Sequence, residues 1–344
     1  MQRPKRIFVI ADFKDEKPWS VFIEERRLAK GLIRGGHDVQ RFSYRNVMMQ
    51  CSPIASKRIA RRIAKKRADE LLVKQVGKYY PHLVFILSMK YLDAETVAAM
   101  RNVAADAVFL GRDGDPFPEE NIARVEIGKQ MDIVIMPSAG RFLKTYKDAG
   151  VPCCAFIPFT SDPDIQYRCQ VDNKWKTDIT FSGTAEHSRL RRDEDRYNLA
   201  KRLSQLPNAK VYACFGEPKT EGLDSFYSIT GAKIGLSINI ANDVRLYHSD
   251  RFINIPACGT FCLAKRTSGY ELMFEDGVHL KYFDTVDEFF DLADWYLKHD
   301  NEREKIAIAG MKRAHDEFNC QRVGGLLLDL IETGAYDAPW AEIL

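Results

Sequence analysis

Short, unbroken apolar runs separated by helical stretches constrain the fold of this chain more than any other feature of its sequence. In the first half these runs cover residues 7–11, 83–87, 107–110 and 133–136. Each has the length of a strand, and unbroken hydrophobicity is typical of parallel strands that helices cover on both faces. Between them, residues 21–34 and 94–102 carry apolar side chains at helical spacing. This alternation predicts a Rossmann-like domain over residues 1–160.

The same alternation begins again in the second half of the chain. Residues 151–158 end the first series, and the polar segment 160–176 follows as a linker. New strands are predicted at 178–183, 210–213, 234–238 and 260–264, and helices near 191–205, 252–258, 286–298 and 302–317. We therefore expect a second Rossmann-like domain at 161–325, followed by a tail at 326–344 that packs back on the first domain. Ligands of such sheets bind at the carboxyl ends of the strands.

Composition excludes several classes of protein. The net charge of +3 gives no general affinity for nucleic acid, and no apolar stretch approaches the roughly 20 residues that span a bilayer. The eight cysteines contain no CxxC pair, which argues against a zinc site and favours reduced thiols. No GxGxxG follows a predicted strand, which argues against a dehydrogenase. We expect a cytoplasmic protein, either free or at a membrane surface.

The segment 247–271 carries the clearest signs of chemistry. Ser249 is a suitable N-cap for a short helix, and free N–H groups at a helix start bind phosphate. Arg251 and Asn254 are three residues apart and share one helix face, so they could hold a phosphate and a ribose hydroxyl. Pro256 should end this helix early. The alternative is an ordinary helix–strand unit with a surface arginine.

This segment resembles the donor-binding segment of GT-B glycosyltransferases, in particular the CgeB-like (spore-maturation) group within the group 1-like family. The matching motifs are RFIN at 251–254, ACG at 257–259, GYE at 269–271 and FEDG at 274–277. The likeness covers residues 178–330 well and the first half more loosely. A glutamate of the family motif is Asn254 here, which keeps hydrogen bonding without a charge. The resemblance implies an α/β fold of two Rossmann-like domains that face a central cleft.

Several further residues are candidates for binding the donor. Asn239 follows a predicted strand and should lie at its carboxyl end. The resemblance adds the turn at Gly183 and Thr184, a basic residue for which we prefer Arg189, and Glu271. The complete predicted donor set is Gly183, Thr184, Arg189, Asn239, Ser249, Arg251, Asn254, Gly259 and Glu271. A solvated surface arginine remains the alternative for Arg189.

In the first domain, Asp113 and Asp115 follow a buried strand and are candidates for a general base. Asp115 and Pro116 also match a D-x-P signature of the CgeB-like group. The alternative is a turn rich in Asp, Gly and Pro, which needs no chemistry. Asp12, after the first strand, is a second acidic candidate. Although Asp113 and Asp115 have DxD spacing, their place in the first domain argues against a donor metal.

Residues 57–67 form a strongly basic run whose apolar residues fall at helical spacing. Such an amphipathic helix could meet a polyanionic acceptor, and we select Arg61, Arg62, Lys65 and Lys66 as acceptor-binding residues. The polyanion could be a cell-envelope glycan, modified DNA, or a membrane that carries a lipid-linked acceptor. The alternative is a solvated helix face packed on the sheet.

Together these features predict a hexosyl- or pentosyltransferase that moves a sugar from a nucleotide-sugar to a hydroxyl. Positive groups would stabilise the departing diphosphate, so we expect no metal and no cofactor. Two alternatives stay open. One is an epimerase or phosphorylase on the same fold, and the other is a catalytically weak protein that binds a sugar nucleotide or nucleic acid.

Overall fold

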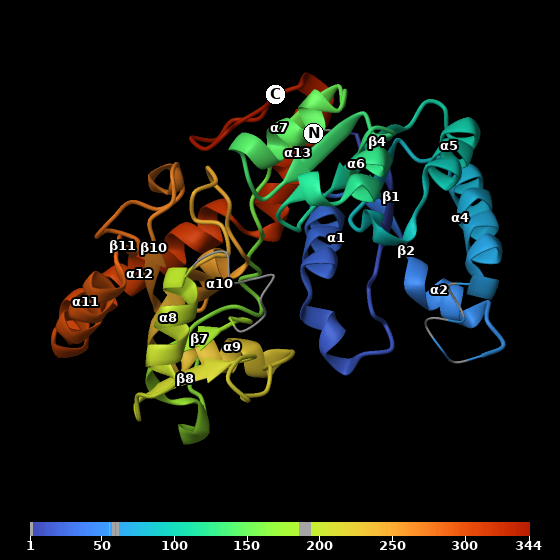
Figure 1. Ribbon diagram of the computed structural model, residues 1–344. Helices are drawn as coiled ribbons and strands as arrows, with labels where there is room; N and C mark the ends of the chain where they lie inside the picture. The colour runs from blue at the N-terminus through green and yellow to red at the C-terminus, as the bar shows by residue number, and fades with distance from the viewer. Residues whose placement is uncertain (1–2, 55, 57–58, 60–61, 186–193) are drawn as a thin grey trace. The chain divides into compact units, whose positions relative to one another are not determined.

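The computed structural model describes residues 3–54, 56, 59, 62–185 and 194–344, and the chain divides into two compact units. The first unit comprises Met1–Ile157 and Cys320–Leu344, and the second comprises Pro158–Asn319. Each contains one parallel sheet with helices, labelled in Figure 1. The predicted α/β fold with two Rossmann-like domains is confirmed. The chain returns to the first unit at Cys320, earlier than the predicted start of the tail at residue 326.

The sheet of the first unit has six parallel strands in the order β2-β1-β3-β4-β5-β6. They are β1 (Arg6–Ala11), β2 (Asp38–Ser43), β3 (Leu83–Ile86), β4 (Val108–Arg112), β5 (Ile133–Met136) and β6 (Cys153–Phe156). The apolar runs of the sequence became the central strands β1, β3, β4 and β5. Their side chains are buried almost throughout, which is why both faces had to be apolar. β2 lies at the sheet edge and is largely polar.

The helices of the first unit are α1 (Glu24–Arg34), α2 (Tyr44–Gln50), α4 (Lys65–Tyr79), α5 (Ala94–Val103), α6 (Ile122–Gly128), α7 (Gly140–Asp148) and α13 (Cys320–Thr333). α13 belongs to the returning segment and packs on α1. A Cβ on Gly31 would lie 2.0 Å from the Cys320 carbonyl oxygen, so this crossing requires glycine in α1. The C-terminal segment is thus fixed to the first unit by close helix packing.

The basic run at 57–67 departs from its predicted form as far as it is described. α4 begins at Lys65, after a turn at Ala64. Ile59 and Ile63, which would pack on the sheet if the run were only a solvated helix face, are exposed. Residues 57–58 and 60–61, Arg61 among them, lie outside the described residues. Spacing alone missed the turn because alanine carries no signal for a helix break.

The sheet of the second unit has five parallel strands in the order β11-β10-β9-β7-β8. They are β7 (Thr177–Ser182), β8 (Ala209–Tyr212), β9 (Ala232–Ser237), β10 (Phe261–Lys265) and β11 (Lys281–Phe283). The helices are α8 (Glu194–Leu203), α9 (Leu223–Thr230), α10 (Arg251–Ala257), α11 (Val286–Lys298) and α12 (Asp300–Glu317). The three-residue β11 is too short to show a pattern in the sequence. In the described part of the chain, no helix is both long and apolar enough to cross a membrane.

Candidate functional site

Two arginines converge at the carboxyl edge of the second unit's sheet. Arg251 is the first residue of α10, and Arg196 lies in α8. Arg251 donates from Nη1 to the Ser182 carbonyl oxygen and from Nη2 to that of Ile238, both at 3.0 Å. Arg196 also donates to Ile238 and, from Nη2, to the Thr184 carbonyl oxygen at 2.9 Å. The ends of β7 and β9 thus hold two guanidinium groups side by side.

Gly183 leaves the space that these two groups occupy. A Cβ at this position would lie 2.8 Å from Arg196 Nη2 and 2.9 Å from Arg251 Nη1. The Phe181 ring supports both guanidinium groups, with its centroid 5.3 Å from Cζ of Arg196 and 5.5 Å from Cζ of Arg251. Gly183 was predicted to belong to the donor-binding turn, and in the structure its missing side chain lets two cations approach each other.

The electrostatics of this pair favour an anion. Among the described residues, no carboxylate lies within ion-pair distance of Arg251, and burial lowers the pKa of its guanidinium despite the nearby charge of Asp250. Arg251 Nε and Ser249 Oγ are buried and have no hydrogen-bond partner in the described part of the chain. Planar guanidinium groups bind phosphate oxygens in pairs, and the guanidinium of Arg251 has no carboxylate partner among the described residues. The arrangement therefore suits a diphosphate.

The side chain of Asn239 makes hydrogen bonds that fix the position of the segment 247–251. Its side chain is almost completely buried, and Nδ2 donates to the Tyr247 carbonyl oxygen at 3.1 Å and to the Tyr270 hydroxyl at 2.7 Å. Its Oδ1 accepts from the Ser249 N–H at 3.0 Å. These bonds occupy both ends of the amide. Asn239, predicted as a donor ligand, instead acts in the structure as a support for the segment 247–251.

The predicted roles of Ser249 and Asn254 differ from what the structure shows. Asp250 holds the N-cap position, its own backbone is helical, and no side chain caps α10. Asn254 is nearly buried, and its Oδ1 accepts from Gln166 Nε2 at 2.5 Å. Helical spacing brings Arg251 and Asn254 close at their Cβ atoms, but it cannot reveal a partner 88 residues away in the sequence. The early end of α10 after Pro256 agrees with the sequence.

The other predicted donor residues lie in different surroundings. Gly259, with φ of 71°, ends α10 at the amino edge of the sheet, away from Arg251, so its predicted place in the donor site is wrong. Glu271 is half exposed and lies 3.1 Å from Arg266 Nη1. Thr184 is exposed and contributes its carbonyl oxygen to Arg196. Arg189 lies outside the described residues.

The two carboxylates predicted as a general base have opposite environments. Asp113 is buried, and it accepts from the Tyr146 hydroxyl at 2.6 Å and from Arg124 Nη1 at 2.8 Å. Burial raises the pKa of Asp113, against the lowering effect of Arg124, and also raises the pKa of Tyr146. A carboxylate saturated in this way supports the turn after β4 and is a poor base. The side chain of Asp115 is 85% exposed, and its Oδ2 lies 3.9 Å from Arg124 Nη1.

The basic residues predicted to bind the acceptor lie in different environments. Arg62 and Lys66 are exposed. The Lys65 ammonium lies 2.6 Å from both Asp69 and Asp93, so it holds α4 to the start of α5. In the part of the chain that is described, no three His, Cys, Asp or Glu side chains are grouped as metal ligands.

Sequence reasoning missed Arg196. Its position in a predicted helix was known, but other arginines of that region carry the same local signal. What distinguishes Arg196 is its burial and its reach to carbonyls beyond β7 and β9. Neither property has a signature in a single sequence.

Solved structures share this fold over nearly the whole chain. Anabaena HepE, in complex with UDP and glucose, has a TM-score of 0.62 at 12% identity, covering 96% of this chain and 100% of that one. Sucrose-phosphate synthase from Thermosynechococcus elongatus has a TM-score of 0.62 at 12% identity, covering 95% and 98%. A glycosyltransferase from Rickettsia africae has a TM-score of 0.57 at 12% identity, covering 96% and 98%.

Part of the amino-acid sequence also resembles a known protein family. No curated protein sequence matches the chain. Residues 191–329, which include Arg196 and Arg251, match a family described as Glycosyl transferase-like. This chain therefore has the GT-B type of fold, with a glycosyltransferase-like sequence in the part that carries the two arginines.

Proposed function

We propose that this chain is a glycosyltransferase that moves a sugar from a nucleoside diphosphate sugar to a hydroxyl acceptor. The observation that carries the proposal is the pair of guanidinium groups of Arg196 and Arg251 around Gly183. They lie at the carboxyl edge of a Rossmann-like sheet, where ligands of such sheets bind. The segment with the glycosyltransferase-like match contains both arginines.

The solved relatives add chemical context. Anabaena HepE has been crystallised with UDP and with UDP-glucose. Its fold is shared by this chain, and a diphosphate is the part of such a ligand that two arginines would bind. This supports a nucleoside diphosphate sugar as donor and leaves the base and the sugar, hexose or pentose, to experiment.

In the proposed reaction, the acceptor oxygen attacks the anomeric carbon while the bond from that carbon to the diphosphate breaks. The diphosphate leaves with the electron pair, and the guanidinium groups of Arg196 and Arg251 stabilise its growing charge, as preorganised cations do without a metal. The acceptor proton passes to a base, for which exposed Asp115 is the candidate in the first unit.

We propose that the first unit handles the acceptor through the exposed side chains of Arg62 and Lys66. Their charge favours an anionic acceptor, such as a cell-envelope glycan, modified DNA or a lipid-linked acceptor at a membrane. We expect replacement of both side chains by glutamine to weaken acceptor binding and to reduce its dependence on salt.

A panel of nucleoside diphosphate sugars, scored by thermal shift, tests the donor proposal. A ligand that binds only the folded protein raises its apparent stability. The stabilising donor is then incubated with the protein, and release of free nucleoside diphosphate is measured. Slow release supports a transferase, conversion of the sugar to an epimer supports an epimerase, and binding without turnover supports a binding protein.

A further inference from the structure

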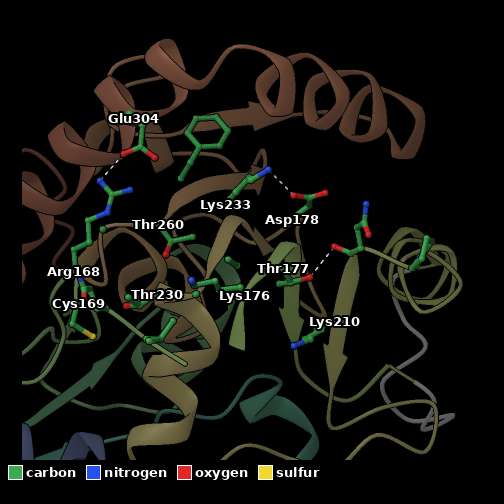
Figure 2. Close-up of a pocket in the computed structure, with 18 residues that line it drawn as sticks. Arg168, Cys169, Lys176, Thr177, Asp178, Lys210, Thr230, Lys233, Thr260 and Glu304 are labelled. Carbon is green, nitrogen blue, oxygen red and sulfur yellow. Dashed lines mark hydrogen bonds and ion pairs between the residues drawn. The ribbon is translucent and has the colours of Figure 1, made fainter. Parts of the chain in front are cut away.

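The second unit carries a hollow of about 900 Å³, whose lining residues are drawn in Figure 2. Its lining includes Thr177, Ala232 and Phe261, the first residues of β7, β9 and β10. Because these strands are parallel, their first residues share the amino edge of the sheet. This amino-edge hollow is therefore separate from the proposed diphosphate site at the carboxyl edge.

A second hollow, of about 500 Å³, lies beside the edge strand β8. Three partly buried aromatic side chains line it: Trp175, Tyr212 and Phe215. We call it the aromatic hollow. Lys210 lines both hollows, and its ammonium donates to the Lys174 carbonyl oxygen. The two hollows thus adjoin across the segment 174–176.

Positive charge is in surplus along this surface. In the amino-edge hollow, Arg168 pairs with Glu304 at 2.5 Å and Lys233 pairs with Asp178 at 2.8 Å, both drawn as dashed lines in Figure 2. Three further lysines line the hollows: Lys174, Lys176 and Lys210. Among the described residues, no carboxylate lies within ion-pair distance of any of these three lysines. An anionic ligand would meet unneutralised cations here.

The end of α9 explains only part of this charge. α9 ends at Thr230, and the carbonyls of a helix C-terminus attract cations within the last turn. Lys174 instead lies over the Trp175 ring, with its Nζ 5.0 Å from the centroid, on a short turn that precedes β7. A helix end requires no aromatic rings, yet three line the aromatic hollow.

We infer that the two hollows together bind an anionic oligosaccharide. Sugar rings present apolar C–H faces that pack on flat aromatic side chains with little loss of side-chain freedom. Acidic groups on the sugar would pair with Lys174 and Lys176, and hydroxyls would donate to Glu217 in the aromatic hollow. A carboxylate there suits a hydroxyl-rich ligand and repels the closely spaced phosphates of nucleic acid. The site goes beyond the proposed transfer reaction and does not depend on it.

Isothermal titration of the full chain with two anionic hexasaccharides, one from polygalacturonate and one from heparin, tests the inference. We expect at least one to bind, with affinity falling as salt rises. The double variant Lys174→Gln/Lys176→Gln should weaken that binding roughly two- to thirty-fold, since each of the two exposed charge pairs is worth about 0.2–1 kcal/mol. Trp175→Leu should weaken it as well, because the stacking surface is lost.

A double variant at Lys298 and Lys312, both changed to Gln, provides the matched control. It removes the same charge from exposed positions on α11 and α12, and should bind like wild type. Nucleoside diphosphate binding should be unchanged in every variant, which separates this site from the donor site. The inference is overturned if neither hexasaccharide binds or if neutral maltohexaose binds equally well. It is also overturned if folded Trp175→Leu binds the hexasaccharide as tightly as wild type, or if duplex DNA binds more tightly than either hexasaccharide.

Discussion

Removing the guanidinium of Arg251 is the most direct test of the diphosphate site. In Arg251→Ala, the diphosphate loses a charge-assisted contact worth roughly 1.5–3 kcal/mol. Affinity for a nucleoside diphosphate should therefore fall about ten- to a hundred-fold. The remaining guanidinium of Arg196 should keep some affinity, so binding should weaken but persist.

The stability of the free protein should change much less than its affinity. The variant loses two hydrogen bonds, to the carbonyls of Ser182 and Ile238, each worth about 1 kcal/mol. Ile238 keeps its bond from Arg196, and removing one of two neighbouring cations relieves their repulsion. These effects oppose each other, so we expect the free energy of unfolding to fall by no more than about 2 kcal/mol.

Titration calorimetry with UDP, GDP, ADP and inorganic pyrophosphate measures the effect without knowledge of the sugar. Arg202→Ala is the matched control, because it removes an exposed arginine from the same helix as Arg196. The control should keep wild-type affinity. Unchanged binding of every ligand by folded Arg251→Ala would refute the assignment of Arg251. Failure of the wild type to bind any of them would refute the proposed function as a whole.

Four further predictions follow from the described contacts. Gly183→Ala should displace the two guanidinium groups, lower diphosphate affinity about ten-fold and lower the melting temperature, because the new Cβ would lie within 3 Å of both groups. Gly325→Ala, where a Cβ meets nothing within 4 Å, should lower neither. Asp113→Asn should cost about 2–4 kcal/mol in urea unfolding, while Asp115→Asn should leave stability within about 0.5 kcal/mol and lower kcat by about 10²–10⁴ if it is the base. Burial raises the pKa of Asp93, but hydrogen bonds from Lys65 and Thr96 outweigh this effect and hold the pKa at about 2. The contribution of Asp93 to the free energy of unfolding should therefore be complete above about pH 4 and be lost as the pH falls toward 2. A carboxyl NMR titration of Lys65→Gln should find the pKa of Asp93 shifted upward. Turnover should survive EDTA, and complete loss that is restored by manganese would contradict a metal-free mechanism.

The positions of the central strands of both sheets could be predicted from the sequence, because they depend on the local pattern of apolar residues. Strands buried on both faces must be apolar throughout, and the runs at 7–11 and 133–136 show this directly. The strand pattern also predicts a ligand site at the carboxyl ends of the second sheet, which is why Asn239 was selected, whereas Arg251 was selected from the predicted helix start and from the resemblance of the segment 251–254. Strands without this requirement, such as the polar edge strand β2 and the short β11, left a weaker signal.

The identity of the partner residues was decided only by the tertiary structure. Ser182, Arg196, Ile238 and Arg251 come from four separate segments, and only the folded sheet brings them to one point. Helical spacing predicted that Asn254 would bind the ligand together with Arg251, whereas in the folded chain the Asn254 side chain accepts a hydrogen bond from Gln166. Asp113 and Asp115 look equivalent in the chain, yet one is buried against Tyr146 and the other faces solvent. Periodicity records which face of an element is buried, but burial of a polar group and its partner depend on contacts between distant segments, which no local pattern encodes.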